Sequence, residues 1–365
     1  MCNLHISGDC HEEIVFALYA VVPTVALVGA SPAQAQVYGS LANFDSVNDT
    51  GEVAHGFEIE IDDPSFDRSK LSSIFGLDRN FGVPPASVER YGAPSIIDLP
   101  GVGVRIRYAA TFANGAWSVG TPSGPYPNAG DSCWPLGNAQ YASLTLTCDH
   151  FGVATYGTPL KTTYNWLIDP GNSGTLSLRQ ANLPAVNFAL QAAPAPGAPQ
   201  PVVAEIEAHK HAGEVFGTPY WVKTFSKHVD HNVKLDDLVK HHADVPGDAE
   251  VEVEFEIFQA GDLNGKKDAA LVLNPGDAAL VVRYEFYRYV GALTPEGETD
   301  CGGHGVQESP ANCGGLGDFV GAQIAGFNAV EPLAAVPEPG QSTLLALGLV
   351  GLAIGWRRRA SSLGF

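Results

Sequence analysis

Histidine side chains gather in one region of the second half of the chain, and imidazole is a common transition-metal ligand. In an extended strand, His209 and His211 would point to the same side, which makes them the candidates for metal binding. The other histidines of the region follow no spacing that a zinc site requires. We therefore expect exposed histidines in a loop-rich region and no cofactor. These other histidines are His228, His231, His241 and His242.

A row of carboxylates alternates with apolar residues between positions 250 and 257. The pattern predicts a strand with Val251, Val253, Phe255 and Ile257 on one face and glutamates on the other. We expect this glutamate face to be solvated, with Arg283 or Arg288 of a later strand, residues 279–290, supplying opposing charge across the sheet. Binding of a divalent cation is the alternative. The row comprises Glu250, Glu252, Glu254 and Glu256.

Four cysteines remain once the first 35 residues are set aside, and they allow three pairings. Their spacing favours two local pairs, Cys133 with Cys148 and Cys301 with Cys313. Such pairs form in oxidising compartments and have a structural role. The competing metal site lacks any Cys-x-x-Cys pair.

Three aromatic residues lie in or beside a long turn-rich stretch, residues 114–138, and are candidates for stacking on sugar rings. They are Trp117, Tyr126 and Trp134. Ordinary core packing is the alternative, because large aromatic side chains are commonly buried.

Catalytic signatures are missing from the sequence. It has no Gly-x-Ser-x-Gly elbow, no His-Glu-x-x-His, no Walker loop and no dinucleotide fingerprint. We therefore predict that the protein is not an enzyme. A secreted hydrolase stays as an alternative, because a glycosidase needs only two carboxylates at the right separation.

The elements that must position these residues are strands. The chain has 41 glycines and 26 prolines, and only 16% of its residues are charged. Alternation in residues 55–61 and 102–108 adds to the strands above, so the composition predicts an all-β protein. The stretch 191–201, rich in proline and alanine, reads as a linker between two β-sandwich-like domains, residues 36–190 and 202–335.

The charge balance excludes one class of partner. Over 365 residues the formal net charge is −20. A nucleic-acid backbone would be repelled by such a chain, so we expect no nucleic-acid partner.

The first 35 residues have the layout of a secretory signal peptide. An apolar run covers residues 14–30, and Ala33 and Ala35 form a small-x-small cleavage site. We expect export and a mature chain that begins near Gln36.

The last thirty residues, 336–365, have the layout of a sorting signal. A proline-bracketed motif is followed by an apolar run, residues 344–356, and then by an arginine cluster. As a helix this run covers roughly 20 Å at about 1.5 Å per residue, too short for a comfortable permanent span of a hydrocarbon core of about 30 Å. The motif is Val336, Pro337, Glu338, Pro339 and Gly340, and the cluster is Arg357, Arg358 and Arg359.

This tail resembles the PEP-CTERM domain, by which bacteria with a Gram-negative envelope deliver proteins through an exosortase. The resemblance implies an exosortase-type partner, transient tethering to the inner membrane, and release at the cell surface or outside the cell. It also implies a link to exopolysaccharide. We therefore expect a non-catalytic structural or adhesive protein of the surface or extracellular matrix, with a carbohydrate-binding module as the alternative.

Overall fold

The computed structural model describes residues 37–77, 90–127, 129–130, 133, 146–190, 202–207, 215–239, 242–247, 253–260, 269–271, 277–301 and 308–329. Within these ranges the only helices are the 3-10 turns η1 (Arg68–Lys70) and η3 (Leu235–Leu238). The fold is all-β and antiparallel, as predicted. No helix in the described ranges is long and apolar enough to cross a membrane.

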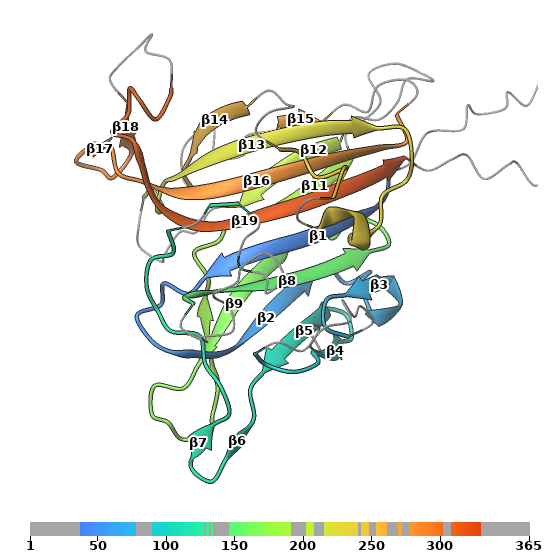
Figure 1. Cartoon of the computed structure of the whole chain (residues 1–365), viewed down its shortest axis with the longest axis vertical. Coiled ribbons are helices and arrows are strands. Elements are labelled where there is room, and N and C mark those ends of the chain that lie inside the picture. Colours follow the sequence, from blue (N-terminus) through green and yellow to red (C-terminus); the bar gives the residue numbers. More distant parts are fainter. Residues whose placement is uncertain are drawn as a thin grey trace, which may run out of the picture. The chain divides into compact units, whose positions relative to one another are not determined.

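The first layer is a seven-stranded sheet with the order β14-β13-β16-β19-β1-β8-β3 (Figure 1). All of its neighbours are antiparallel. Its strands are β1 (Val37–Val47), β3 (Leu71–Ile74), β8 (Cys148–Thr155), β13 (Tyr220–Val229), β14 (Val253–Phe258), β16 (Ala279–Tyr289) and β19 (Leu316–Ala329).

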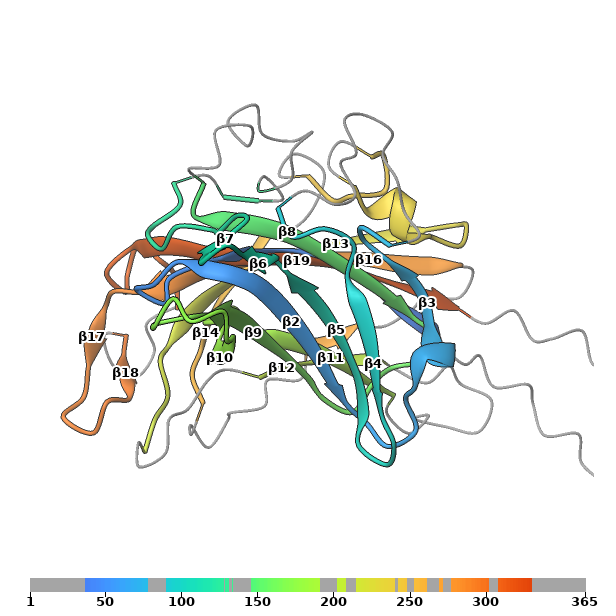
Figure 2. The same cartoon turned by 90° about the horizontal axis from the view of Figure 1, so that it is seen from below.

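The second layer consists of a five-stranded sheet, β10-β9-β2-β5-β4, and a three-stranded sheet, β11-β12-β15 (Figure 2). Two short hairpins, β6–β7 and β17–β18, complete the strands. The bounds are β2 (Ala54–Asp62), β4 (Ser95–Leu99), β5 (Gly103–Ala109), β6 (Phe112–Ala113), β7 (Ala116–Trp117), β9 (Thr162–Ile168), β10 (Ser177–Gln180), β11 (Ala185–Leu190), β12 (Val202–Glu207), β15 (Ala269–Leu271), β17 (Ala292–Leu293) and β18 (Thr299–Asp300).

The predicted division of the body at 191–201 needs correction. Strand β1 pairs with β19, so residues 37 and 329 are cross-strand neighbours and one sheet contains strands from both sides of the expected linker. Moreover, β11 and β12, which flank this stretch, pair with each other from Leu190↔Val202 onward. The stretch itself lies outside the described residues. It connects two strands of one sheet and does not separate two domains.

The main core lies between the layers and contains side chains from both. Phe44 of β1 stacks on Tyr164 of β9 at 4.6 Å between ring centroids, and Phe57 of β2 stacks on Phe151 of β8 at 4.1 Å. The alternation predicted for residues 55–61 and 102–108 is confirmed, because the apolar positions of β2 and β5 are buried in this core.

The opposite face of β2 and β5 is charged, as the alternation requires. Arg107 is an ion-pair partner of Glu58, and the Nε of Arg105 lies 2.9 Å from Oε1 of Glu60. Burial raises the pKa of the Glu60 carboxyl, and the Arg105 guanidinium counteracts part of that effect. The pairs are cross-strand neighbours, the arrangement in which opposite charges stabilise a sheet.

The prediction for the glutamate row fails in its partners. Strand β13 lies between β14 and β16, so neither arginine is a cross-strand neighbour of the row. Arg283 pairs with Glu285 of its own strand at 3.2 Å, and Arg288 pairs with Asp49. Residues 250 and 252 lie outside the described ranges. The error arose because strands consecutive in the pattern were assumed to be adjacent in space.

Candidate functional site

A groove of about 310 Å³ opens beside the edge strand β3 of the seven-stranded sheet. Its walls come from three places that are far apart in sequence: β3, the end of β8, and the segment around η3 that follows β13. The lining residues are Ser72, Ser73, Ala154, Thr155, Tyr156, Val233, Lys234, Leu235, Asp236 and Asn328.

The η3 segment is held firmly against the sheet. Leu235 and Leu238 are buried in an apolar cluster on the outer face, together with Val281 and Ile324. The side chain of Asn43 donates a hydrogen bond to the carbonyl oxygen of Leu238 at 2.7 Å. This wall of the groove is therefore anchored by both apolar packing and buried polar contacts.

A second clamp fixes the start of the segment. The side-chain oxygen of Asn328 accepts from the Val233 amide at 2.7 Å, and its side-chain nitrogen donates to the Val233 carbonyl at 2.7 Å. Both backbone groups of Val233 are thus satisfied by a single side chain of β19. The groove is consequently preformed, as small-molecule sites usually are.

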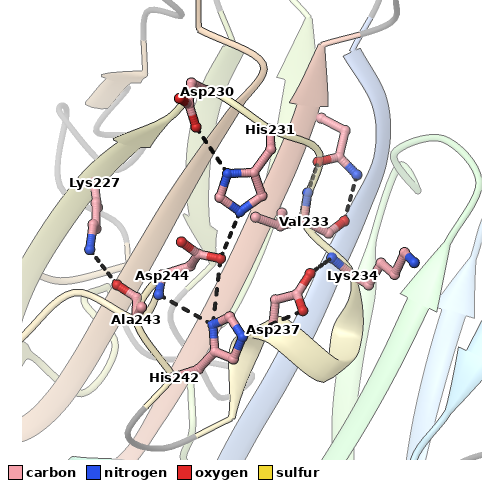
Figure 3. A network of polar contacts seen from close by, with 10 residues as sticks. Lys227, Asp230, His231, Val233, Lys234, Asp237, His242, Ala243 and Asp244 are labelled. Carbon is pink, nitrogen blue, oxygen red and sulfur yellow. Dashed lines mark hydrogen bonds and ion pairs between the residues drawn. The ribbon is translucent and has the colours of Figure 1, made fainter.

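A histidine and carboxylate network lies next to the groove on the same segment (Figure 3). Oδ2 of Asp244 is 2.9 Å from Nε2 of His231 and 3.5 Å from Nδ1 of His242. The other ring nitrogen of His231 lies 3.1 Å from Asp230, and that of His242 lies 3.6 Å from Asp237. Asp244 is buried, while the His231 side chain is 53% exposed.

Hydrogen bonds to Asp230 and Asp244 raise the pKa of His231 above its ordinary value of 6.5. The folded pKa therefore exceeds the unfolded one, so protonated His231 stabilises the folded segment below about pH 6.5. This contribution is lost as the pH rises through the raised folded value.

We expect segment 230–247 to be several-fold better protected from amide hydrogen exchange at pH 5.5 than at pH 8, after correction for intrinsic rates. The variant His231→Gln should remove this difference. His55→Gln is the control, because His55 contacts Val119 and Trp117 in another part of the fold. Equal protection at both pH values in the unmodified protein would contradict the prediction.

The histidine candidates for metal binding are distributed as follows. His209, His211 and His241 lie outside the described residues. His228 pairs with Asp277 at 2.6 Å, and His231 and His242 belong to the network above. Within the described part of the chain, no group of three or more His, Cys, Asp or Glu side chains could hold a metal ion.

The three aromatic candidates do not form one sugar-binding platform within the described residues. Trp117 is half-buried on β7, where it stacks on His55 at 4.8 Å and donates from its indole nitrogen to Asp169 at 2.9 Å. Tyr126 is only 3% exposed, in an apolar cluster on the outer face of the seven-stranded sheet. Trp134 lies outside the described residues. Packing explains Trp117 and Tyr126.

A buried ion pair lies on the outer face of the seven-stranded sheet. Nδ1 of His150 is 2.7 Å from Oδ1 of Asp45, and the backbone amide of Cys133 donates to Oδ2 of Asp45 at 2.9 Å. His150 and Asp45 are 4% and 0% exposed. A general base must reach its substrate. The buried position of this pair gives it a structural function in the described arrangement.

Glu285 continues the charged row on the neighbouring strand β16. It accepts from the Tyr287 hydroxyl at 2.7 Å and pairs with Arg283 at 3.2 Å, while Lys223 lies 4.0 Å away. Glu285 is 3% exposed. The row thus neutralises its own charge beneath the segment that contains Cys133.

Both predicted disulfides are present in the structure. Cys133 is joined to Cys148 and Cys301 to Cys313. The sequence separations are 15 and 12 residues. Local spacing was therefore a sufficient signal for the pairing.

Sequence reasoning missed the groove. Its hydroxyl groups and Lys234 have no distinctive spacing, and β3 and η3 lie about 160 residues apart in the chain. Only the sheet order brings the end of β8 and β3 beside η3. The histidine count drew attention to the correct segment, but for the reason of metal binding.

Comparison with known proteins identifies one segment. A family model described as the PEP-CTERM protein-sorting motif matches residues 335–359. No curated protein and no solved structure matches the chain at a significant level. The predicted sorting tail is confirmed, so this is an exported protein, processed by an exosortase-type enzyme. The tail and the predicted signal peptide, residues 1–35, both lie outside the described residues.

Proposed function

We propose that the protein is a non-catalytic structural or adhesive component of the cell surface or extracellular matrix, associated with exopolysaccharide. The observation that carries this proposal is the sorting motif at residues 335–359. Two disulfides in an antiparallel body support it, because disulfides persist in oxidising compartments outside the cytoplasm. Several charged side chains of the body, among them Glu58, Asp149 and His150, are paired and buried, as a structural role requires.

In this proposal the producing cell has a Gram-negative-type envelope, and the apolar run 344–356 holds the chain in the inner membrane only transiently. The run is short for a permanent span, and Arg357 to Arg359 favour a cytoplasmic position for the C-terminus. The exosortase-type enzyme then removes the tail near Val336 to Gly340.

The experiment is fractionation of the producing cells followed by mass spectrometry of the C-terminus. We expect the body in the surface or extracellular fraction, with a C-terminus that lacks Arg357 to Phe365. An intact tail on extracellular protein would sink the processing step. Enzymatic digestion of the exopolysaccharide should release the surface-bound protein, and retention after complete digestion would contradict the association.

A carbohydrate-binding module is the second candidate function, and the groove beside β3 favours it. The groove combines hydroxyl groups with Tyr156, a ring that is 40% exposed. A pull-down against the polysaccharide of the producing organism tests this candidate. Trp117→Ala should leave the binding unchanged, because that indole is committed to Asp169 and His55. Turnover of a polysaccharide or peptide substrate would instead favour the remaining alternative, a secreted hydrolase.

A further inference from the structure

The size of the groove limits its ligand to a small unit. Its volume of about 310 Å³ lies at the lower end of the range for ligand sites, roughly 300 to 1,000 Å³. A space of this size suits about one or two pyranose rings. One wall belongs to the edge strand β3, so a longer chain can enter from the side of the sheet.

The polar groups of the walls match the hydroxyl groups of a sugar. Ser72, Ser73 and Thr155 each contribute a hydroxyl, which donates one hydrogen bond and accepts two. The hydroxyl of Thr155 already donates to the carbonyl of Gly157 at 2.8 Å, and its lone pairs retain acceptor capacity. These groups therefore bind a ligand without losing their contacts within the protein.

Tyr156 provides a flat apolar surface at the mouth of the groove. Its side chain is 40% exposed, although the neighbouring Thr155 is buried. The backbone amide of Tyr156 donates to the carbonyl of Lys70 at 2.7 Å, which fixes its position beside β3. An aromatic ring with two rotatable angles loses little entropy when a ligand packs against it.

Lys234 gives the groove a positive charge in a chain with a net charge of −20. Its backbone amide donates to Oδ2 of Asp237 at 2.7 Å, while its side chain extends away from that carboxylate (Figure 3). Among the described residues no acidic side chain forms an ion pair with the Lys234 ammonium. A cation left without a carboxylate partner at a ligand-sized groove indicates an anionic ligand group.

We propose that this groove binds an acidic saccharide, a uronic acid unit of a polysaccharide, with the carboxylate on Lys234, the hydroxyl groups on Ser72, Ser73 and Thr155, and one ring face on Tyr156. Asp236, at the same wall, accepts from sugar hydroxyl groups and disfavours any pose that places the uronate carboxylate beside it. This inference rests on the proposed association with exopolysaccharide and names its chemistry.

The test is calorimetric titration of the exported protein, purified from the producing cells, with an oligogalacturonate. EDTA is present throughout, so that calcium cannot bridge the acidic protein and the acidic sugar. We expect binding that weakens as salt is added, and at least tenfold weaker binding of a neutral oligoglucan of the same length. Binding of both sugars with equal affinity would overturn the proposal, as would binding of neither.

Variants assign the binding to the groove. Lys234→Gln should weaken uronate binding about tenfold and leave the neutral sugar unaffected, and Tyr156→Ala should weaken both. Arg179→Gln is the matched control, because it removes one positive charge from an exposed position on β10 in the other layer. Unaltered uronate binding in Lys234→Gln and Tyr156→Ala, with both variants folded, would place the site elsewhere and refute this assignment.

The outcome is separable from that of the proposed function. Fractionation and digestion of the exopolysaccharide report whether the protein resides in the matrix, irrespective of the groove. If the protein stays in the matrix while the purified protein ignores oligogalacturonate, only the proposal for the groove fails. If the protein never reaches the surface, the proposed function fails whatever the calorimetry shows.

Discussion

Replacing Arg90 with methionine is expected to lower the free energy of unfolding by about 3 to 5 kcal/mol. Nε of Arg90 lies 2.7 Å from Oδ1 of Asp149, and the two side chains are 0% and 3% exposed. The guanidinium also donates to the carbonyl groups of Gly120 and Leu146, each at 3.1 Å. Its removal leaves a buried carboxylate without a counter-charge and two carbonyl groups without donors.

The two remaining partners of Asp149 cannot replace the guanidinium. The hydroxyl groups of Tyr91 and Thr121 both donate to Oδ2 of Asp149. Burial and the Asp149 charge raise the pKa of Tyr91 well above its ordinary value, so this hydroxyl remains protonated and donating at neutral pH. Two neutral donors stabilise a buried carboxylate less than an adjacent cation does.

The measurement is urea denaturation of the purified exported protein at neutral pH. A second variant, Arg90→Met with Asp149→Asn, should recover part of the loss, because the uncompensated charge is gone. Arg68→Met is the matched control. It breaks an ion pair to Asp98, but that arginine is 59% exposed, so the loss should stay within about 1 kcal/mol. Equal losses in Arg68→Met and Arg90→Met would mean that burial does not set the cost.

Local patterns in the sequence predicted the faces of the strands well. In β16 the alternation placed Leu280, Val282, Tyr284 and Phe286 on one side, and all four are buried in the main core. Side-chain direction in a strand has a period of two and depends on the strand alone. The class of the fold followed from such patterns together with the abundance of glycine and proline.

The partners of the strands could not be predicted in the same way. Pairing of β1 with β19 joins residues nearly 300 positions apart, and no local pattern encodes such a contact. The proline-rich stretch 191–201 has the composition of a linker, yet composition does not distinguish a domain boundary from a connection between paired strands. The expected domain boundary was wrong for that reason, and the expected arginine partners of the glutamate row failed with it.

Charged residues on the outer face of the seven-stranded sheet show the same limit. Asp149 and His150 are adjacent in sequence, and adjacent residues of a strand point to opposite faces. Asp149 therefore joins Arg90, while His150 joins Asp45 on the other side. Alternation alone predicts that one of the two faces solvent. Both are buried because the outer face is covered near the Cys133–Cys148 disulfide, a tertiary feature.

Removing the Cys133–Cys148 disulfide, as the double variant Cys133→Ala with Cys148→Ala, is expected to cost about 3 kcal/mol from chain entropy alone. Further loss should follow from its position. Both cysteines are fully buried, and the Cys133 amide is a hydrogen-bond donor to the buried Asp45 carboxylate. Once the segment is free to move, water reaches the Asp45 and His150 pair, and the pair loses a donor.

The second disulfide separates these two contributions. Cys301 and Cys313 are 12 residues apart, against 15 for the first pair, so the chain-entropy model assigns nearly the same loss to both. Cys301 is only half-buried, next to the short hairpin β17–β18. In urea denaturation we therefore expect Cys301→Ala with Cys313→Ala to lose about 3 kcal/mol or less, and the Cys133 variant to lose clearly more. Equal losses would mean that the charged row beneath Cys133 does not depend on the disulfide. In that case the first disulfide would act only on the unfolded chain.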